Sequence, residues 1–205
     1  MDIVVLCSSR FGHTRRICGR VADILRQDGN DARVLDITGR ERIEPAPGRA
    51  VIVGASTRYG YFSPRVWRFA RTNAAALAHI PSAFFGVNLV AANDGKNTPE
   101  TNVYMRRFFE HTPWKPDMID VFAGDLDFSL YNPFDAAVIK MIRRFMGRDI
   151  DFTQRVEFTN WDDVATFAHD FSALAAHGKL TIADPVAGSH DIPMNTPDLP
   201  VLRGH

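Results

Sequence analysis

Apolar residues along the first part of the chain follow two alternating patterns. Short uninterrupted apolar runs, such as residues 50–55, are typical of strands buried on both faces of a parallel sheet. Between these runs, apolar residues recur at helical spacing, as in residues 14–27. The pattern predicts strands over residues 3–7, 32–37, 50–55, 83–90 and 118–123, and helices over residues 14–27, 64–79 and 99–111. This alternation predicts an α/β fold, with a doubly wound parallel sheet and helices on both of its faces.

The regular alternation stops at residues 124–152. A predicted loop, residues 124–133, precedes a predicted amphipathic helix, residues 134–146. One face of this helix would carry Phe134, Ala137, Val138, Met141, Ile142 and Phe145, with Lys140, Arg143 and Arg144 along its border. Such a face usually packs on the core, whereas the basic border also fits a helix that docks on a membrane surface or walls a substrate site. Both interpretations stay open at this point.

Beyond this insertion, the pattern predicts a short strand over residues 155–159 and a closing helix over residues 161–177. The C-terminal residues are rich in Pro, Gly, Asp and Asn and show little periodicity, which predicts a poorly ordered tail. We therefore expect one domain over residues 1–180, with the insertion at 124–152, and a tail over residues 181–205.

The composition narrows the functional classes. The formal net charge of the 205 residues is +0, so the chain lacks the global positive field expected of a nucleic-acid-binding protein. Neither Cys7 nor Cys18 has histidines or further cysteines at metal-ligand spacing, which predicts buried, reduced thiols and no metal site. No apolar stretch reaches about 20 residues and no secretion signal opens the chain, so we expect a cytoplasmic protein.

The turn after the first strand has the sequence SSRFGHTR. Its single glycine and the lack of a Gly-Lys pair argue against a Walker loop and against a dinucleotide-binding turn. In the hydroxyl-rich turn that remains, backbone N–H groups, Ser9 and Thr14 can hold a terminal phosphate. Arg10 and His13 can add charge-assisted hydrogen bonds. The same residues also fit an ordinary N-capped turn, and this loop alone does not decide between the two.

A second candidate loop, with the sequence GASTRYGYFSP, follows the third strand. An aromatic, glycine-containing loop beside a phosphate-binding turn suits a flat ring that stacks on a side chain. The alternative is a surface loop with incidental tyrosines. Ligands in doubly wound sheets bind at the carboxyl ends of the strands, so two such loops on neighbouring strands favour a ligand site.

The two loops resemble those of the flavodoxin-like superfamily, and the chain more closely resembles the menaquinone-dependent protoporphyrinogen IX dehydrogenase family. Further segments that carry this resemblance are PSAFFGVNLVA, NTPETNVYMRRFF, WKPD, YNPFDAAVIKMIRRFMG and TNWDDVATFA. The resemblance runs from the first strand to about residue 179. It implies a flavodoxin-like sheet of five parallel strands in the order 2-1-3-4-5, with FMN across the strand ends.

The resemblance also implies which residues contact FMN. By their positions in the matching motifs, these are Ser9, Arg10, Phe11, Gly12, His13 and Thr14 at the phosphate, Ser56, Thr57, Arg58, Tyr59, Gly60 and Tyr61 at the flavin ring, and Asn88 in a third wall. Because the flavin carries the chemistry, no catalytic acid or base is predicted. Candidates for contact with the substrate or a membrane are Phe134, Lys140, Met141, Arg143, Arg144 and Phe145 in the inserted helix.

The reaction that the resemblance implies is the oxidation of protoporphyrinogen IX to protoporphyrin IX, with electrons passed to menaquinone or another quinone. It further implies a protein on the inner face of the cytoplasmic membrane and leaves a homo-oligomer open. A flavodoxin-type electron carrier, an NAD(P)H:quinone reductase and a flavin-free phosphate-binding module are the alternatives. Such carriers are typically acidic, so the balanced charge of this chain disfavours the first of them.

Overall fold

A parallel sheet forms the centre of the protein in the computed structural model, which describes residues 1–126 and 155–178. Its strands are β1 (Asp2–Ser8), β2 (Asp31–Asp36), β3 (Arg49–Arg58), β5 (Ser82–Asn88) and β6 (Met118–Ala123). They lie in the order β2-β1-β3-β5-β6, with every pair along this path parallel. This order confirms the predicted doubly wound, flavodoxin-like sheet.

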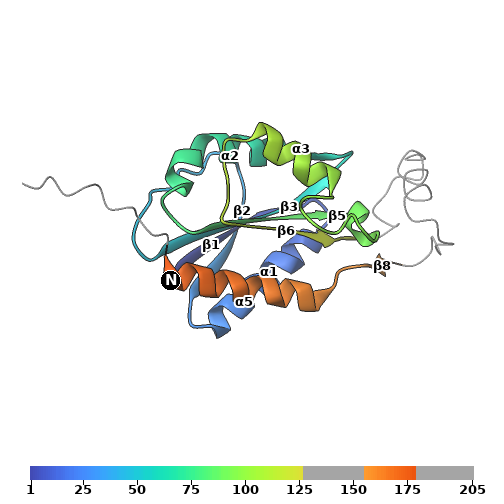
Figure 1. The fold of residues 1–205 in the computed structure, drawn as a ribbon. Coiled ribbons are helices and arrows are strands. Elements are labelled where there is room, and N and C mark those ends of the chain that lie inside the picture. Colours follow the sequence, from blue (N-terminus) through green and yellow to red (C-terminus); the bar gives the residue numbers. More distant parts are fainter. Residues whose placement is uncertain (127–154, 179–205) are drawn as a thin grey trace, which may run out of the picture.

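Helices cover both faces of the sheet (Figure 1). The helices α1 (His13–Gln27) and α5 (Trp161–His177) lie on one face, and α2 (Pro64–Leu77) and α3 (Val103–His111) lie on the other. The same division appears in the interior, where Phe85 packs with the residues of α1 and α5 and the neighbouring Phe84 packs with those of α2 and α3. Adjacent side chains of a strand point to opposite faces, so the buried run of β5 supplies both cores.

The register of the strands brings their carboxyl ends together. Ser8 of β1 lies beside Ala55 of β3, and Ala55 lies beside Gly86 of β5. The turns that leave β1 and β3 therefore emerge next to each other at one edge of the sheet. In a doubly wound fold this edge is where ligands bind.

Several boundaries differ from those predicted. The fourth predicted strand ends at Asn88, and the next residues form the 3₁₀ helix η1 (Leu89–Ala92). The helix predicted from residue 99 begins at Val103, because the Asn102 side chain accepts a hydrogen bond from the Tyr104 N–H and caps the helix there. The sequence also gave no sign of β4 (Tyr61–Phe62), an antiparallel addition to the end of β3.

A two-stranded antiparallel sheet pairs the segments on either side of residues 127–154. It consists of β7 (Asp125–Leu126) and β8 (Val156–Glu157), and β8 falls inside the strand predicted over residues 155–159. The predicted amphipathic helix, residues 134–146, and the predicted tail, residues 181–205, lie outside the described residues.

Two further predictions concern cysteine chemistry and membrane spans. Both Cys7 and Cys18 are free and buried, as predicted. Among the helices that the structure describes, none has the length and apolar character needed to cross a membrane.

Candidate cofactor site

A pocket of about 1050 Å³ opens at the carboxyl ends of β1 and β3. Its volume is in the upper range of sites that hold cofactors and drug-sized ligands. The turn after β1, the turn between β3 and β4 and the start of α2 form its walls. Predicted site residues that line it are Ser9, Arg10, Phe11, Gly12, Ser56, Arg58, Tyr59 and Tyr61.

The N-terminus of α1 faces this pocket without a side-chain cap. Gly12 is the N-cap residue with a φ of 89°, and an added Cβ at this position would meet no atom within 4 Å. Its own N–H donates to Ser9 Oγ at 3.1 Å, and the first turn of α1 holds no acidic residue. The other described α-helices, in contrast, are capped by the side chains of Ser63, Asn102 and Asn160. The first N–H groups of α1 and the open space at Gly12 therefore suit an anion.

The charged side chains around the pocket also favour an anion. Four arginines line it, namely Arg10, Arg15, Arg58 and Arg65, against a single carboxylate, Asp36. Arg15 forms an ion pair with that carboxylate. The balance of charge at the pocket is thus positive although the whole chain is formally neutral.

Exposed aromatic rings gather around the same pocket. The described large apolar side chains with high exposure include Phe11 at 41%, Tyr59 at 57% and Tyr61 at 59%, and all three line this pocket. Tyr59 has a φ of 49°, which non-glycine residues adopt only at a cost, and such strained positions concentrate at functional sites. Arg58 lies 4.7 Å from the centre of the Tyr59 ring and donates to Tyr59 Oη at 3.1 Å. These rings can form a platform for a planar ligand.

His13 lies at the start of α1, but its side chain is buried and does not line the pocket. Its Nε2 lies 2.6 Å from Thr159 Oγ1, and its Nδ1 lies 3.6 Å from a carboxylate oxygen of Asp125. Because Thr159 Oγ1 donates to the Ala123 carbonyl oxygen at 2.7 Å, the hydroxyl accepts from His13 Nε2–H. This placement differs from the predicted side-chain contact with a phosphate. His13 instead joins the turn after β1 to Asp125 of β7 and to Thr159, which follows β8.

Burial governs the protonation of His13. Removal from water lowers the pKa of the His13 imidazole below its ordinary value, against the opposing effect of the nearby Asp125 and Glu157 carboxylates. Asp125 is in turn held by Arg155, whose Nη2 lies 2.6 Å away. Since Asp125 already has this cationic partner, we take His13 to be neutral near pH 7, with its proton on Nε2.

Four other predicted residues also lie away from the pocket lining, namely Thr14, Thr57, Gly60 and Asn88. Thr14 is buried with 2% exposure, and Gly60 forms the turn before β4 with a φ of 83°. Asn88 Oδ1 accepts hydrogen bonds from the Ala91 N–H at 3.0 Å and from Asn102 Nδ2 at 3.1 Å. The Asn88 side chain thus holds η1 to the start of α3 rather than forming a wall of the pocket.

Sequence reasoning also missed residues that line the pocket. Arg15, Ser63 and Arg65 belong to its lining, with the latter two at the start of α2. A signal for Ser63 and Arg65 was present in the segment SPRVWRFAR, which opens a helix directly after a predicted ligand loop and holds arginines without carboxylates. Within the described residues, no group of three or more His, Cys, Asp or Glu side chains could hold a metal ion.

Comparisons with known proteins agree with this geometry. A family model described as a flavodoxin domain matches residues 4–153. The protoporphyrinogen IX dehydrogenase [quinone] of Escherichia coli strain K12 is 36% identical over 174 residues, which cover 85% of this chain and 96% of that protein. A Leishmania major protein of the same name is 38% identical over 175 residues, covering 83% of this chain and 74% of that protein.

Solved structures are more distant. A flavodoxin from the domain Archaea covers 86% of this chain and 100% of its own, with 16% identity and a TM-score of 0.47. An oxidised flavodoxin from Bacillus cereus covers 84% of this chain at 14% identity, with a TM-score of 0.45. The match to a flavodoxin domain implies that this chain binds FMN. The positive lining and exposed rings of the pocket at α1 suit a phosphate joined to a planar ring system.

Proposed function

Since this chain belongs to the flavodoxin-domain family, we propose that it uses bound FMN to oxidise protoporphyrinogen IX to protoporphyrin IX and passes the electrons to a quinone. The observation that carries this proposal is the 36% identity over 96% of the Escherichia coli relative of that name. The pocket at α1 supports it, because its residues fit the cofactor that such an oxidation requires.

Different residues of this chain would contact the phosphate and the ring system of FMN. The first N–H groups of α1, Ser9 and Arg10 would hold the phosphate, because they surround the uncapped helix start. Tyr59 and Tyr61 would lie against the ring system. When bound, FMN supplies the reversible two-electron chemistry, and the protein binds it, orients it and limits the access of water.

The proposed electron acceptor is menaquinone or another quinone of the membrane, which places the protein at the inner surface of the cytoplasmic membrane. The sequence of residues 134–146 supports this part, because as the predicted helix it would carry Lys140, Arg143 and Arg144 along the border of an apolar face. Deleting residues 130–150 should then abolish turnover with a lipophilic quinone while FMN stays bound. Unchanged turnover after the deletion would remove any role for this segment.

An anaerobic assay tests the function directly. FMN-loaded protein mixed with protoporphyrinogen IX and a menaquinone analogue should generate porphyrin fluorescence well above the rate without protein. Protein that retains its FMN but shows no rate above that blank would refute the proposed activity.

The same preparation separates the alternatives. Rapid bleaching of the flavin by NADPH alone would favour an NAD(P)H:quinone reductase. Folded protein that takes up no FMN would favour a flavin-free module. A carrier would exchange electrons with a protein partner but leave protoporphyrinogen at its uncatalysed rate.

A further inference from the structure

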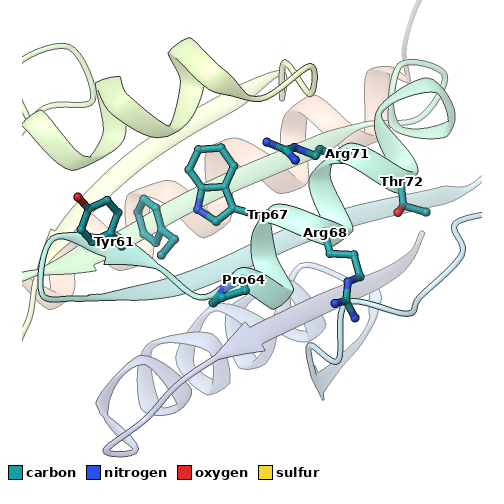
Figure 2. A pocket seen from close by; sticks show the side chains of 7 residues that line it. Tyr61, Pro64, Trp67, Arg68, Arg71 and Thr72 are labelled. Atoms are coloured by element: carbon teal, nitrogen blue, oxygen red, sulfur yellow. The ribbon is translucent and has the colours of Figure 1, made fainter.

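A second pocket lies beside the FMN pocket, on the outer side of α2 (Figure 2). It has a volume of about 680 Å³ and is lined mainly by Tyr61, Pro64, Trp67, Arg68, Arg71 and Thr72. The five residues from α2 recur at intervals of three and four positions, so they form one stripe of the helix. The opposite stripe of α2, including Val66 and Phe69, is buried in the core. The pocket therefore belongs to the face of α2 that points away from the sheet.

Residues of α3 contact the aromatic side chains that form the apolar base of this second pocket. The Trp67 ring meets the Phe108 ring of α3 edge-on, with centroids 4.6 Å apart. Arg107, also on α3, lies 5.2 Å from the centre of the Tyr61 ring. Figure 2 shows Trp67 between Tyr61 and Arg71 along this face. The aromatic surface of this pocket is therefore packed against residues of α3.

The charge around this apolar base has a single sign. Helix α2 carries Arg65, Arg68 and Arg71 and no acidic residue. Within the described part of the chain, neither Arg68 nor Arg71 forms an ion pair, and Arg71 lies 5.9 Å from the centre of the Trp67 ring. A pocket that is apolar at its base and cationic at its rim is complementary to an apolar ligand that carries carboxylates.

The two pockets adjoin each other. Tyr61, Phe62 and Pro64 line both of them. A ligand on Trp67 would therefore lie next to a ring system held against Tyr59 and Tyr61. This proximity is the arrangement that electron transfer between a substrate and a bound flavin requires.

We propose that this second pocket binds the tetrapyrrole substrate, an inference that rests on the proposed function. The apolar body of the macrocycle lies on Tyr61 and Trp67, and its two propionate carboxylates pair with Arg68 and Arg71. These arginines are one helical turn apart, so they can serve two carboxylates on one edge of the same ligand. The pocket is a site of substrate recognition, and FMN stays in the pocket at α1.

Binding of protoporphyrin IX, the fluorescent product, to the FMN-loaded protein provides the test. The double variant Arg68→Gln/Arg71→Gln should weaken binding at least tenfold, which corresponds to about 1.4 kcal/mol. It should raise the KM for protoporphyrinogen IX by a similar factor and leave FMN affinity and the KM for the quinone unchanged. Arg20→Gln is the matched control, because Arg20 is exposed on α1, on the opposite face of the sheet.

Two further measurements test the details of the pocket. Porphyrin dimethyl ester, which lacks the charges, should bind more weakly than the diacid and should not distinguish the double variant from the wild type. Porphyrin binding should weaken in Trp67→Leu, because Trp67 would be in contact with the ligand, while Trp114→Phe, a change at a buried ring outside the pocket lining, should alter it little.

The outcomes separate this inference from the function on which it rests. If the wild type oxidises protoporphyrinogen and the double variant does so with the same KM and porphyrin affinity, the pocket is not the substrate site and the proposed function stands. If the wild type has no such activity, the function itself fails. If the double variant loses binding to anionic vesicles but keeps its porphyrin affinity, the arginines contact a lipid surface. If only its sedimentation changes, they contact a second copy of the chain. Either result overturns the inference.

Discussion

Two connections at the same edge of the sheet use similar polar residues for different purposes. The turn after β1 ends in a helix with no side-chain cap, and its N–H groups face a pocket. The connection after β5 directs its polar groups inward, where Asn88 and Asn102 bond to each other and cap η1 and α3. The first connection therefore has unused hydrogen-bonding groups for a ligand, and the second has used its groups to hold its own backbone.

If the turn after β1 binds the phosphate as proposed, the contrast means that polar residues at these strand ends mark a binding site only where their hydrogen bonds are not already made inside the protein. His13 illustrates the point within the binding turn itself. Its neighbour Gly12 faces open space, whereas the His13 ring is buried against Thr159. Burial and hydrogen bonding, rather than residue type, separate the two roles.

The largest effect is expected for Asn88→Ala. This change removes the acceptor of the Ala91 N–H and of one hydrogen of the buried Asn102 amide, whose other hydrogen still bonds the Lys96 carbonyl oxygen, at a cost of about 2–3 kcal/mol in the free energy of unfolding. The melting temperature of the FMN-free protein should fall by roughly 5–10 °C. In the exposed Asn97→Ala control, it should stay within about 2 °C.

FMN affinity, measured below the melting transition, should change little in Asn88→Ala. A normal melting temperature combined with a large loss of FMN affinity would show that Asn88 is a ligand residue, and the contrast between the two connections would then be wrong.

A smaller effect, confined to ligand binding, is expected for Arg10→Glu in the turn after β1. Reversing the charge beside the uncapped helix should weaken FMN binding at least tenfold, or about 1.4 kcal/mol, by losing a phosphate contact. Because Arg10 is exposed, unfolding of the FMN-free protein should change by less than about 0.5 kcal/mol. Fluorescence titration measures the FMN affinity, and thermal melting measures the stability of the FMN-free protein. Arg20→Glu is the control for the change of charge alone.

The smallest effect concerns Asp120 of β6, the strand beside β5. Burial, together with the charges of Asp163, Glu100 and Asp170, raises the pKa of the Asp120 carboxyl to about 6. The folded state then holds this proton more tightly than the unfolded state, so the contribution of Asp120 to stability falls as pH rises from about 4 to 6 and stays low above that range.

Asp120→Asn should therefore stabilise the protein at pH 7.5 by about 1 kcal/mol, after a reduction for solvent screening, and have little effect near pH 4. Denaturant melts at the two pH values measure the difference, with the exposed Asp94→Asn as the control. Equal effects of Asp120→Asn at both pH values would contradict the raised pKa.

Much of the fold could be predicted because its signals are local. The run AVIVGA predicts a strand covered on both faces, and this run lies within β3 at the centre of the sheet. The first turn alone also fitted an ordinary N-capped turn. Together with the aromatic loop after β3 it favoured a ligand site, and residues of both loops line the pocket at the ends of β1 and β3.

The remaining features depend on contacts between distant residues. The strands β7 and β8 have two residues each and pair across about 30 intervening positions, so no local pattern reveals their register. The bonds of His13 to Thr159 and of Asn88 to Asn102 are of the same kind, so neither the loop sequence around His13 nor the family resemblance at Asn88 revealed these internal partners. Arg65 lines the pocket because the start of α2 lies near the end of β1, and this proximity arises only in the folded sheet.

The measurement that tests the central claim most directly compares the affinities of FMN and riboflavin for the ligand-free protein. The two molecules share the ring system and differ in the phosphate. If the uncapped start of α1 with Ser9 and Arg10 holds the phosphate, FMN should bind at least 100-fold more tightly than riboflavin, a difference of about 2.7 kcal/mol, and Arg10→Glu should reduce this ratio. Equal affinities for the two molecules, or a ratio that Arg10→Glu leaves unchanged, would contradict the account.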